Sequence, residues 1–332
     1  MDDDPVPALV DRVDELQRRR RVLGVPIAVV YKFFDDQGGY LAAVLTHYAF
    51  VAIFPMLLIA SSVLGFVLQG HPALEHQILT SALAQFPIVG DQLGRPGGIQ
   101  GSASAVVVGT LTATYGVIGL GQAAQNAVNV TWAIPRNSRL NPIVSRLRSL
   151  GWLVLAGLAL VLVAVLAGVG SQVEVFDSRF GGAVHWALLA TTVVVNAVVL
   201  SMMMRWSTPQ KDRWRDVLPG AATIAVMWQG LQLLGGAYVS HVIAKASRMN
   251  GAFAVVLGLV ALLYIASVMA MLGLEVNVVL GKQLYPRALL TPFTDAVRLT
   301  EADKRVYREY ARAQRHKGFE RVHVTFGDPP EP

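Results

Sequence analysis

The chain has 332 residues, of which 54% are hydrophobic and only 15% are charged, and its mean hydropathy is +0.48. Few water-soluble domains of this length have such a composition, which favours an integral membrane protein. Cysteine is absent from the sequence, and this excludes disulfides, thiolate metal sites and cysteine nucleophiles. The first residues lack the apolar core and small-residue cleavage site of a signal peptide, so we expect them to belong to the mature protein.

Residues 1–36 are predicted to form a cytoplasmic segment that contains a basic amphipathic helix. Four consecutive arginines stand before an apolar stretch that includes Phe33 and Phe34. A helix of this kind lies on the inner leaflet, where its arginines contact anionic lipid head groups. The contacting residues would be Arg18, Arg19, Arg20 and Arg21. In the alternative interpretation, the cluster only orients the first span and has no lipid specificity.

Six apolar stretches are predicted to cross the membrane. A spanning helix needs about 20 apolar residues, because each residue rises about 1.5 Å across a hydrocarbon core of about 30 Å. Windows without Asp, Glu, Lys or Arg, one of them interrupted only by Glu275, place the spans at approximately 40–69, 103–132, 149–172, 182–204, 218–240 and 252–281. Together they make an all-α membrane domain, residues 37–281, with one large external loop at 70–101.

The basic residues predict the orientation of these six spans. Of the 28 lysines and arginines, 24 lie in the two terminal segments and in the second and fourth connecting loops. Such an excess over short loops marks the cytoplasmic side, so both termini are expected there. The tail, residues 282–332, carries charges of both signs and is predicted to form a short exposed helix followed by a disordered Pro-rich end.

Polar residues recur at three- and four-residue steps in the second, fifth and sixth spans, which places those of each span on one helix face. The candidates are Tyr115, Gln122, Asn126 and Asn129 in the second span, Gln229 and Gln232 in the fifth, and Tyr264, Ser267, Glu275 and Asn277 in the sixth. In one interpretation these groups only hold helices together. In the other they line a cavity for a polar or amphipathic substrate, with Glu275 as its fixed or protonatable charge.

Three further residues bear on this choice. Pro55 lies within the first span, where it is expected to kink the helix, as near some transport sites. His47, in the same span, is a cavity candidate that can titrate near neutral pH, although histidines at such positions are more often hydrogen-bond partners between helices. Lys282 shares a helix face with Glu275 and is expected to neutralise it in part.

No constellation of catalytic residues emerges from the sequence. The seven histidines show no close metal-binding spacing, and no phosphate-binding loop of the P-loop type occurs. We therefore expect no metal, no cofactor and no nucleic-acid partner. A lipid-modifying enzyme remains a less supported alternative.

Three stretches carry a resemblance to a known family: GGYLAAVLTHYAFVAIFPMLL (38–58), YGVIGLGQAAQNAVNVTWAIPR (115–136) and NGAFAVVLGLVALLYIASVMAMLGLEVNVVL (250–280). Together with the basic amphipathic entry, they resemble the YihY/BrkB family of bacterial inner-membrane proteins, in particular its YhjD-like branch, over roughly residues 20–285. The sequence departs from the family at Ala52, where serine is frequent, so no role of that serine is carried over.

The resemblance implies a six-helix inner-membrane protein that is associated with envelope integrity and with transport of lipids or lipid-linked envelope precursors. The family has also carried a ribonuclease label, which this sequence contradicts because it has no metal-ligand cluster. Our leading hypothesis is a bundle whose polar cavity between spans two, five and six handles such a lipid. The alternative is a non-transporting structural or scaffold protein of the cell envelope.

Overall fold

The structure is a computed structural model, and it describes residues 14–67, 103–151, 155, 181–207, 214–241, 251–289, 291 and 297–327. Over these residues the chain is helical and contains no strand, as the sequence predicts. The external loop at 70–101 and all but the first residues of the third predicted span, 149–172, lie outside the described residues.

The described helices follow the sequence-based prediction closely. A short helical stretch at 14–19 and another at 142–151 accompany α2 (Arg21–Asp35), α3 (Gly38–Val67), α6 (Ala103–Thr131), the 3-10 turn η1 (Arg136–Ser138), α8 (Gly181–Ser207), α9 (Trp214–His241), α10 (Gly251–Gly281) and α11 (Glu301–Ala313). The five long helices, α3, α6, α8, α9 and α10, coincide with predicted spans one, two, four, five and six.

Each of these five helices has 27 to 31 residues, more than the roughly 20 that a crossing requires. Within the described residues, two stretches are both long and apolar enough to cross a membrane: Leu189–Trp206 in α8 and Val256–Gly281 in α10. A shorter apolar stretch, Gly38–Ile53, lies in α3.

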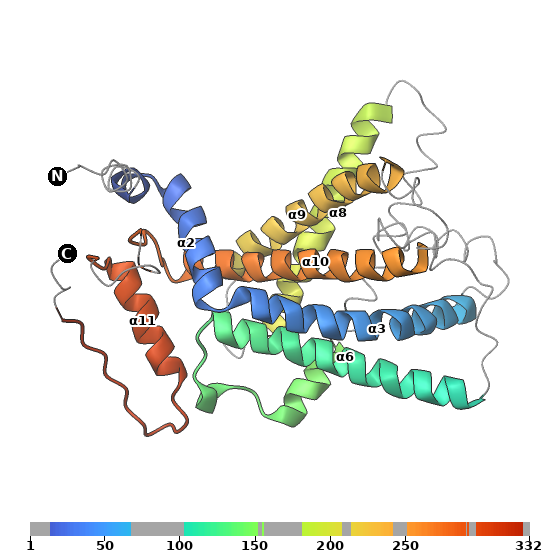
Figure 1. Ribbon diagram of the computed structural model, residues 1–332, viewed down its shortest axis with the longest axis horizontal. Helices are drawn as coiled ribbons and strands as arrows, with labels where there is room; N and C mark the ends of the chain where they lie inside the picture. The colour runs from blue at the N-terminus through green and yellow to red at the C-terminus, as the bar shows by residue number, and fades with distance from the viewer. Residues whose placement is uncertain are drawn as a thin grey trace.

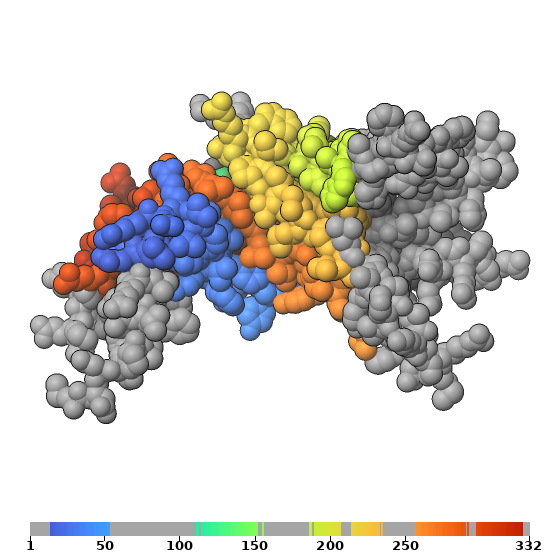
Figure 2. All heavy atoms as spheres, turned by 90° about the horizontal axis from the view of Figure 1, so that it is seen from above, coloured from blue at the N-terminus to red at the C-terminus, as the bar shows by residue number. Residues whose placement is uncertain are grey.

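Helix α10 is central to the arrangement (Figure 1). It packs against α3 on one side and α9 on the other, while α6 covers α3 and α8 covers α9. Helix α2 stands across the end of α10 at a steep angle to the long helices and also contacts it. Figure 2 shows α2 in blue and α11 in red gathered at one end of the molecule, which is the end that the basic residues predict to be cytoplasmic.

Three helices stop at this end through a residue in the left-handed conformation: Gln37 after α2, Ala133 after α6 and Gln283 after α10, with φ of 55°, 50° and 53°. After α6 and α10, the residue that follows the left-handed one, Ile134 or Leu284, donates a backbone hydrogen bond of 2.9 Å to the carbonyl five positions earlier. Both of their side chains are buried, which is the hydrophobic contact that usually accompanies such a helix stop. The chain therefore turns sharply after both α6 and α10.

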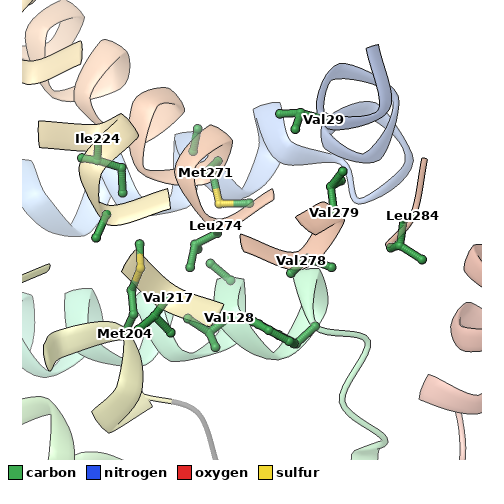
Figure 3. Packing of buried hydrophobic residues seen from close by; sticks show 14 of the residues in the cluster. Val29, Val128, Met204, Val217, Ile224, Met271, Leu274, Val278, Val279 and Leu284 are labelled. Atoms are coloured by element: carbon green, nitrogen blue, oxygen red, sulfur yellow. The ribbon is translucent and has the colours of Figure 1, made fainter. Parts of the chain in front are cut away.

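The hydrophobic core joins all the long helices near this end (Figure 3). Val128 of α6, Met204 of α8, Val217 of α9 and Leu274 of α10 lie in one cluster of buried residues. The cluster continues through Val29 of α2. Helix α2 is therefore packed onto the bundle through one face, and its opposite face is exposed at Val30 and Phe34.

The tail helix differs from the prediction of an exposed helix. Thr300 caps α11 and is reciprocated by Asp303 in a capping box, so the start of the helix is fixed. Ala302, Val306 and Ala313 are buried on one side of it. The high charge of this segment indicated exposure, but the apolar side packs against the protein together with Asp303, while Glu301, Arg305 and Arg312 are exposed.

Candidate substrate cavity and buried ion cluster

An apolar cavity of about 300 Å³ lies between α3, α6, α8, α9 and α10. The residues around it are Leu45, Ala49, Val117, Leu120, Gly121, Ala124, Ala127, Val128, Ser149, Leu200, Met203, Met204, Ile224, Leu263, Ala266, Ser267, Ala270 and Leu274. Many of them are alanine or glycine, and small side chains at facing positions leave space between the helices. A cavity with such walls suits an apolar group such as part of an acyl chain.

The cavity is not the polar one that the sequence predicts. Among the predicted candidates, Ser267 lines it, whereas Glu275 and the polar residues of α6 do not. The reason is the orientation of α6. Its polar stripe lies on the side opposite the cavity, where Asn126 is exposed and Tyr115, 60% exposed, contacts the ring of Tyr48 in α3. The face of α6 that includes Ala124 borders the cavity.

The remaining candidates are dispersed. His47 and Tyr264 are exposed, and Gln122, Asn129, Gln229 and Gln232 are partly buried. His47 packs its ring edge-on against Tyr48, with the ring centroids 5.2 Å apart. Pro55 lies within α3, at a position whose side chain is outside the described residues. The structure therefore does not gather these side chains into one polar site.

Two candidates tie helices together. The Asn277 side-chain oxygen accepts a hydrogen bond of 2.6 Å from the backbone N–H of Gly220, which links α10 to α9. The Thr46 hydroxyl lies 3.2 Å from the Ser267 hydroxyl, which links α3 to α10. Both contacts are of the adhesive type that polar residues make between membrane helices.

One buried amide was missed by the sequence-based prediction. Gln125 of α6 is 3% exposed, and its side chain donates to the Ser149 hydroxyl at 3.0 Å and accepts from the Ser145 hydroxyl at 2.7 Å. These bonds fasten the helical stretch at 142–151 to α6. The available signal was the second glutamine of the QAAQN run, which lies off the predicted polar stripe.

Glu275 is fully buried in a cluster of charged groups at the end of the bundle where α2 and α11 lie. The Lys32 ammonium of α2 lies 3.8 Å from a Glu275 carboxylate oxygen and is also paired with Asp36. The same ammonium donates a hydrogen bond of 3.1 Å to the Thr131 carbonyl of α6 and lies 5.0 Å from the ring centre of Tyr310 in α11. Residues of α2, α6, α10 and α11 thus enclose one ammonium. We call Lys32, Asp36 and Glu275 the buried ion cluster.

The expected partner of Glu275 was wrong. Lys282 instead forms an ion pair of 2.8 Å with Glu309 of α11 and donates a hydrogen bond of 2.7 Å to the Trp132 carbonyl. Helical periodicity can only pair Glu275 with a residue of its own helix. Lys32 belongs to the amphipathic segment, and the sequence alone did not indicate that it pairs with Glu275.

The cluster contains one cation for two carboxylates. Both oxygens of Glu275 and one oxygen of Asp36 are buried without a hydrogen-bond partner in the described part of the chain. Buried charges require pairing, because transfer from water is costly for each of them. Lys32 is therefore the group on which the charge balance of this site depends.

A second buried ion pair lies beside the cluster. Arg287, which is 1% exposed, pairs with Asp303 of α11 and, at 3.0 Å, with Asp35 of α2. Burial raises the pKa of Asp35, although the Arg287 guanidinium opposes this shift. Burial likewise raises the pKa of the Tyr310 hydroxyl, which stays protonated. These contacts fasten both terminal helices to the segment that follows α10.

The four predicted lipid-contacting arginines are exposed. Arg18 pairs with Asp14 at 2.6 Å, and Arg19 pairs with Glu15 at 3.5 Å. Within the described residues no group of three or more potential ligands could hold a metal ion.

Comparison with known proteins gave one match. The family model described as virulence factor BrkB matches residues 29–294, a range that includes α3 to α10 and the second half of α2. Lys32, Asp36, Glu275 and Arg287 lie within the matched range, whereas α11 lies beyond it. No curated protein and no solved structure matches the chain.

Proposed function

Because the chain belongs to the BrkB virulence-factor family, we propose that it is a multi-pass protein of the bacterial inner membrane with six spans and cytoplasmic termini. The lengths of α3, α6, α8, α9 and α10 support the proposed spans. The distribution of lysine and arginine supports the orientation.

Within this membrane domain, we propose that the protein handles or translocates an envelope lipid or a lipid-linked envelope precursor. The observation that carries this proposal is the apolar cavity of about 300 Å³ lined by residues of five long helices. Its walls suit the hydrocarbon chain of a lipid. They do not suit a head group, because Ser149 and Ser267 are the polar residues that line it.

The polar head group would therefore remain at the basic cytoplasmic end while the chain enters the bundle. Glu275 has a different role in this scheme from the one expected of a cavity residue. Its carboxylate lies beside the Lys32 ammonium of α2, and this ion pair helps to hold α2 on the bundle. We propose that it acts on the lipid only through the position of α2.

Filling the cavity tests the proposal. Ala270 of α10 lines the cavity, whereas Ala261 of the same helix is exposed. We expect Ala270→Phe to reduce translocation of a fluorescent phospholipid in proteoliposomes at least about tenfold, because the ring occupies space that the chain needs. Ala261→Phe should leave the rate within about twofold of wild type. Equal translocation by both folded variants would contradict the proposal.

A second candidate is a structural or scaffold protein of the envelope that moves no lipid. It is favoured by Asn277 and Ser267, whose hydrogen bonds join helices. In that case reconstituted wild-type protein shows no translocation above protein-free vesicles, and Ala270→Phe changes only the thermal stability. We propose no enzymatic activity, because neither serine at the cavity has a histidine or carboxylate beside it among the lining residues.

A further inference from the structure

A second, polar cavity of about 210 Å³ lies at the end of the bundle where α2 and α11 lie, outside the buried ion cluster. It is lined by Gln17, Arg18, Arg21, Gln283, Tyr285, Pro286 and Arg305. These residues come from three separate segments: the start of α2 with the stretch before it, the turn after α10, and α11. We call this cavity the arginine pocket.

Three guanidinium groups border the arginine pocket, and one carboxylate accompanies them. Arg18 is paired with Asp14 at 2.6 Å. Arg21 lies 5.9 Å from the ring centre of Tyr285, and Arg305 donates to the backbone carbonyls of Glu301 and Lys282 at 3.3 and 3.4 Å. Neither Arg21 nor Arg305 is paired with a carboxylate among the described residues. Counted over the described residues, the pocket therefore has an excess of about two positive charges.

The three segments hold the pocket in place through contacts that do not involve those two arginines. The Gln17 amide donates to the Arg287 backbone carbonyl, and Asp14 accepts a hydrogen bond of 3.2 Å from the Leu289 backbone N–H. Arg287 in turn pairs with Asp303 of α11. The contacts that fix α2 and α11 to the segment after α10 therefore also hold the sides of the pocket in place.

We infer that the arginine pocket binds a phosphate monoester. Guanidinium groups donate paired hydrogen bonds that match the oxygens of a phosphate. A monoester carries a charge of about −1.5 to −2 near pH 7 and has three acceptor oxygens, so it matches the excess of the pocket. A phosphodiester, with a single charge, leaves part of that excess unbalanced.

The phosphate belongs either to a lipid head group or to a soluble phosphate ester. Val30 and Phe34, 46% and 69% exposed, lie four residues apart on one face of α2 and give the helix that carries Arg21 an exposed apolar surface. This surface favours a lipid source, because such a helix lies in the membrane interface. The inference that the pocket binds a lipid head group rests on the proposed function. The inference that it binds a phosphate monoester does not.

Direct binding to the full chain in detergent micelles tests this inference. The probes are dihexanoyl phosphatidic acid, which is a monoester, dihexanoyl phosphatidylglycerol, which is a diester, and glycerol 3-phosphate and inorganic phosphate, which carry no acyl chains. The pocket variant is Arg21→Gln with Arg305→Gln. The matched control is Arg20→Gln with Arg312→Gln, which removes the same charge at neighbouring exposed positions that do not line the pocket.

We expect wild type to bind phosphatidic acid at least about tenfold more tightly than phosphatidylglycerol. The pocket variant should lose at least about tenfold in affinity for the monoester, because it loses charged hydrogen bonds, and the control less than about twofold. Equal losses in both variants, no loss in either, or equal binding of monoester and diester would overturn the inference. Gel filtration establishes that each variant is folded, and single variants at Arg21 and Arg305 provide independent readings.

The chain-free probes identify the source of the phosphate. Glycerol 3-phosphate or inorganic phosphate binding as tightly as phosphatidic acid indicates a soluble ligand, whereas much weaker binding indicates a lipid head group. The Ala270→Phe variant should retain phosphate binding, since Ala270 lines the apolar cavity and does not line this pocket. Loss of translocation and loss of phosphate binding can therefore be distinguished.

Discussion

Lys32 is a lysine that is 1% exposed and faces two carboxylates from different helices, Asp36 and Glu275. Breaking a buried ion pair by removing one partner is more harmful than never having had the pair, because the remaining charge stays buried without compensation. At this site one substitution would leave two carboxylates in that state. Lys32 should therefore be far more sensitive than the lysines at the surface.

We predict that Lys32→Met lowers the free energy of unfolding by about 3–5 kcal/mol, because both carboxylates lose the one ammonium that pairs with them in the described part of the chain. Thermal unfolding in detergent measures this loss. Lys304→Met is the control, since Lys304 forms a more exposed pair with Glu301 at 3.2 Å and such pairs contribute about 0–1 kcal/mol.

Because the buried ion cluster has two carboxylates and one ammonium, removing one carboxylate should have a much smaller effect on stability. Glu275→Gln removes the unmatched charge and leaves the Lys32–Asp36 pair intact, so its unfolding free energy should stay within about 1 kcal/mol of wild type. The double variant Lys32→Met with Glu275→Gln should be more stable than Lys32→Met alone. A Glu275→Gln variant as unstable as Lys32→Met would refute this view of the charge balance.

The sequence identified Glu275 as an unusual residue but not its partner. A carboxylate in an apolar run is visible in one sequence, because its cost depends on its surroundings within the same helix. The partner comes from a segment 243 positions earlier, so only the tertiary packing of α2 onto α10 brings the two together. Lys282 was expected in that place because periodicity relates residues of one helix alone.

At the scale of helices, α9 and α10 approach each other closely at Gly220. A methyl group on Gly220 would overlap the Gly273 carbonyl oxygen and the Asn277 side chain, whereas one on Gly230 of the same helix would meet nothing within 4 Å. The two glycines therefore have opposite expected responses to the same substitution.

We predict that Gly220→Ala lowers the free energy of unfolding by about 1–3 kcal/mol or more, because the helices must separate to admit the methyl group. Gly230→Ala should raise it by up to about 1 kcal/mol, because alanine favours a helix interior more than glycine does. Both values come from thermal unfolding in detergent. Similar responses at the two positions would argue against the close approach of α9 and α10.

The positions of the helices could be predicted from the sequence, whereas the direction of their faces could not. Runs of about 20 or more apolar residues give the helices, since little else satisfies backbone hydrogen bonds in a membrane. Periodicity then shows that Tyr115 and Asn126 share a face. It does not say what that face meets, and in the structure both residues are exposed on the side opposite the cavity, while Ala124 borders it.

At the scale of the whole molecule, both terminal helices lie at one end (Figure 2), where Arg287 connects them through Asp35 and Asp303. The distribution of basic residues predicts that this end is cytoplasmic. The absence of cysteine from the sequence makes the prediction directly testable with single introduced thiols.

We predict that a cysteine at position 95, introduced as Arg95→Cys, reacts with a membrane-impermeant maleimide in intact spheroplasts, because residues 70–101 are predicted to be external. Gln314→Cys, after α11, should react only once the membrane is permeabilised. Labelling of Gln314→Cys in intact spheroplasts would reverse the orientation. Cysteine-free wild type is the blank for both.

The apolar cavity also gives the protein a mechanical property. A cavity of about 300 Å³ between the helices adds to the volume change of unfolding to the extent that no molecule fills it, so hydrostatic pressure favours unfolding more when the cavity is unfilled. A hydrocarbon chain that fills the space removes the void and with it most of this volume change. The resistance of the protein to pressure therefore shows whether the cavity is occupied. If a compound stabilises the wild type under pressure but not Ala270→Phe, the compound binds between these helices.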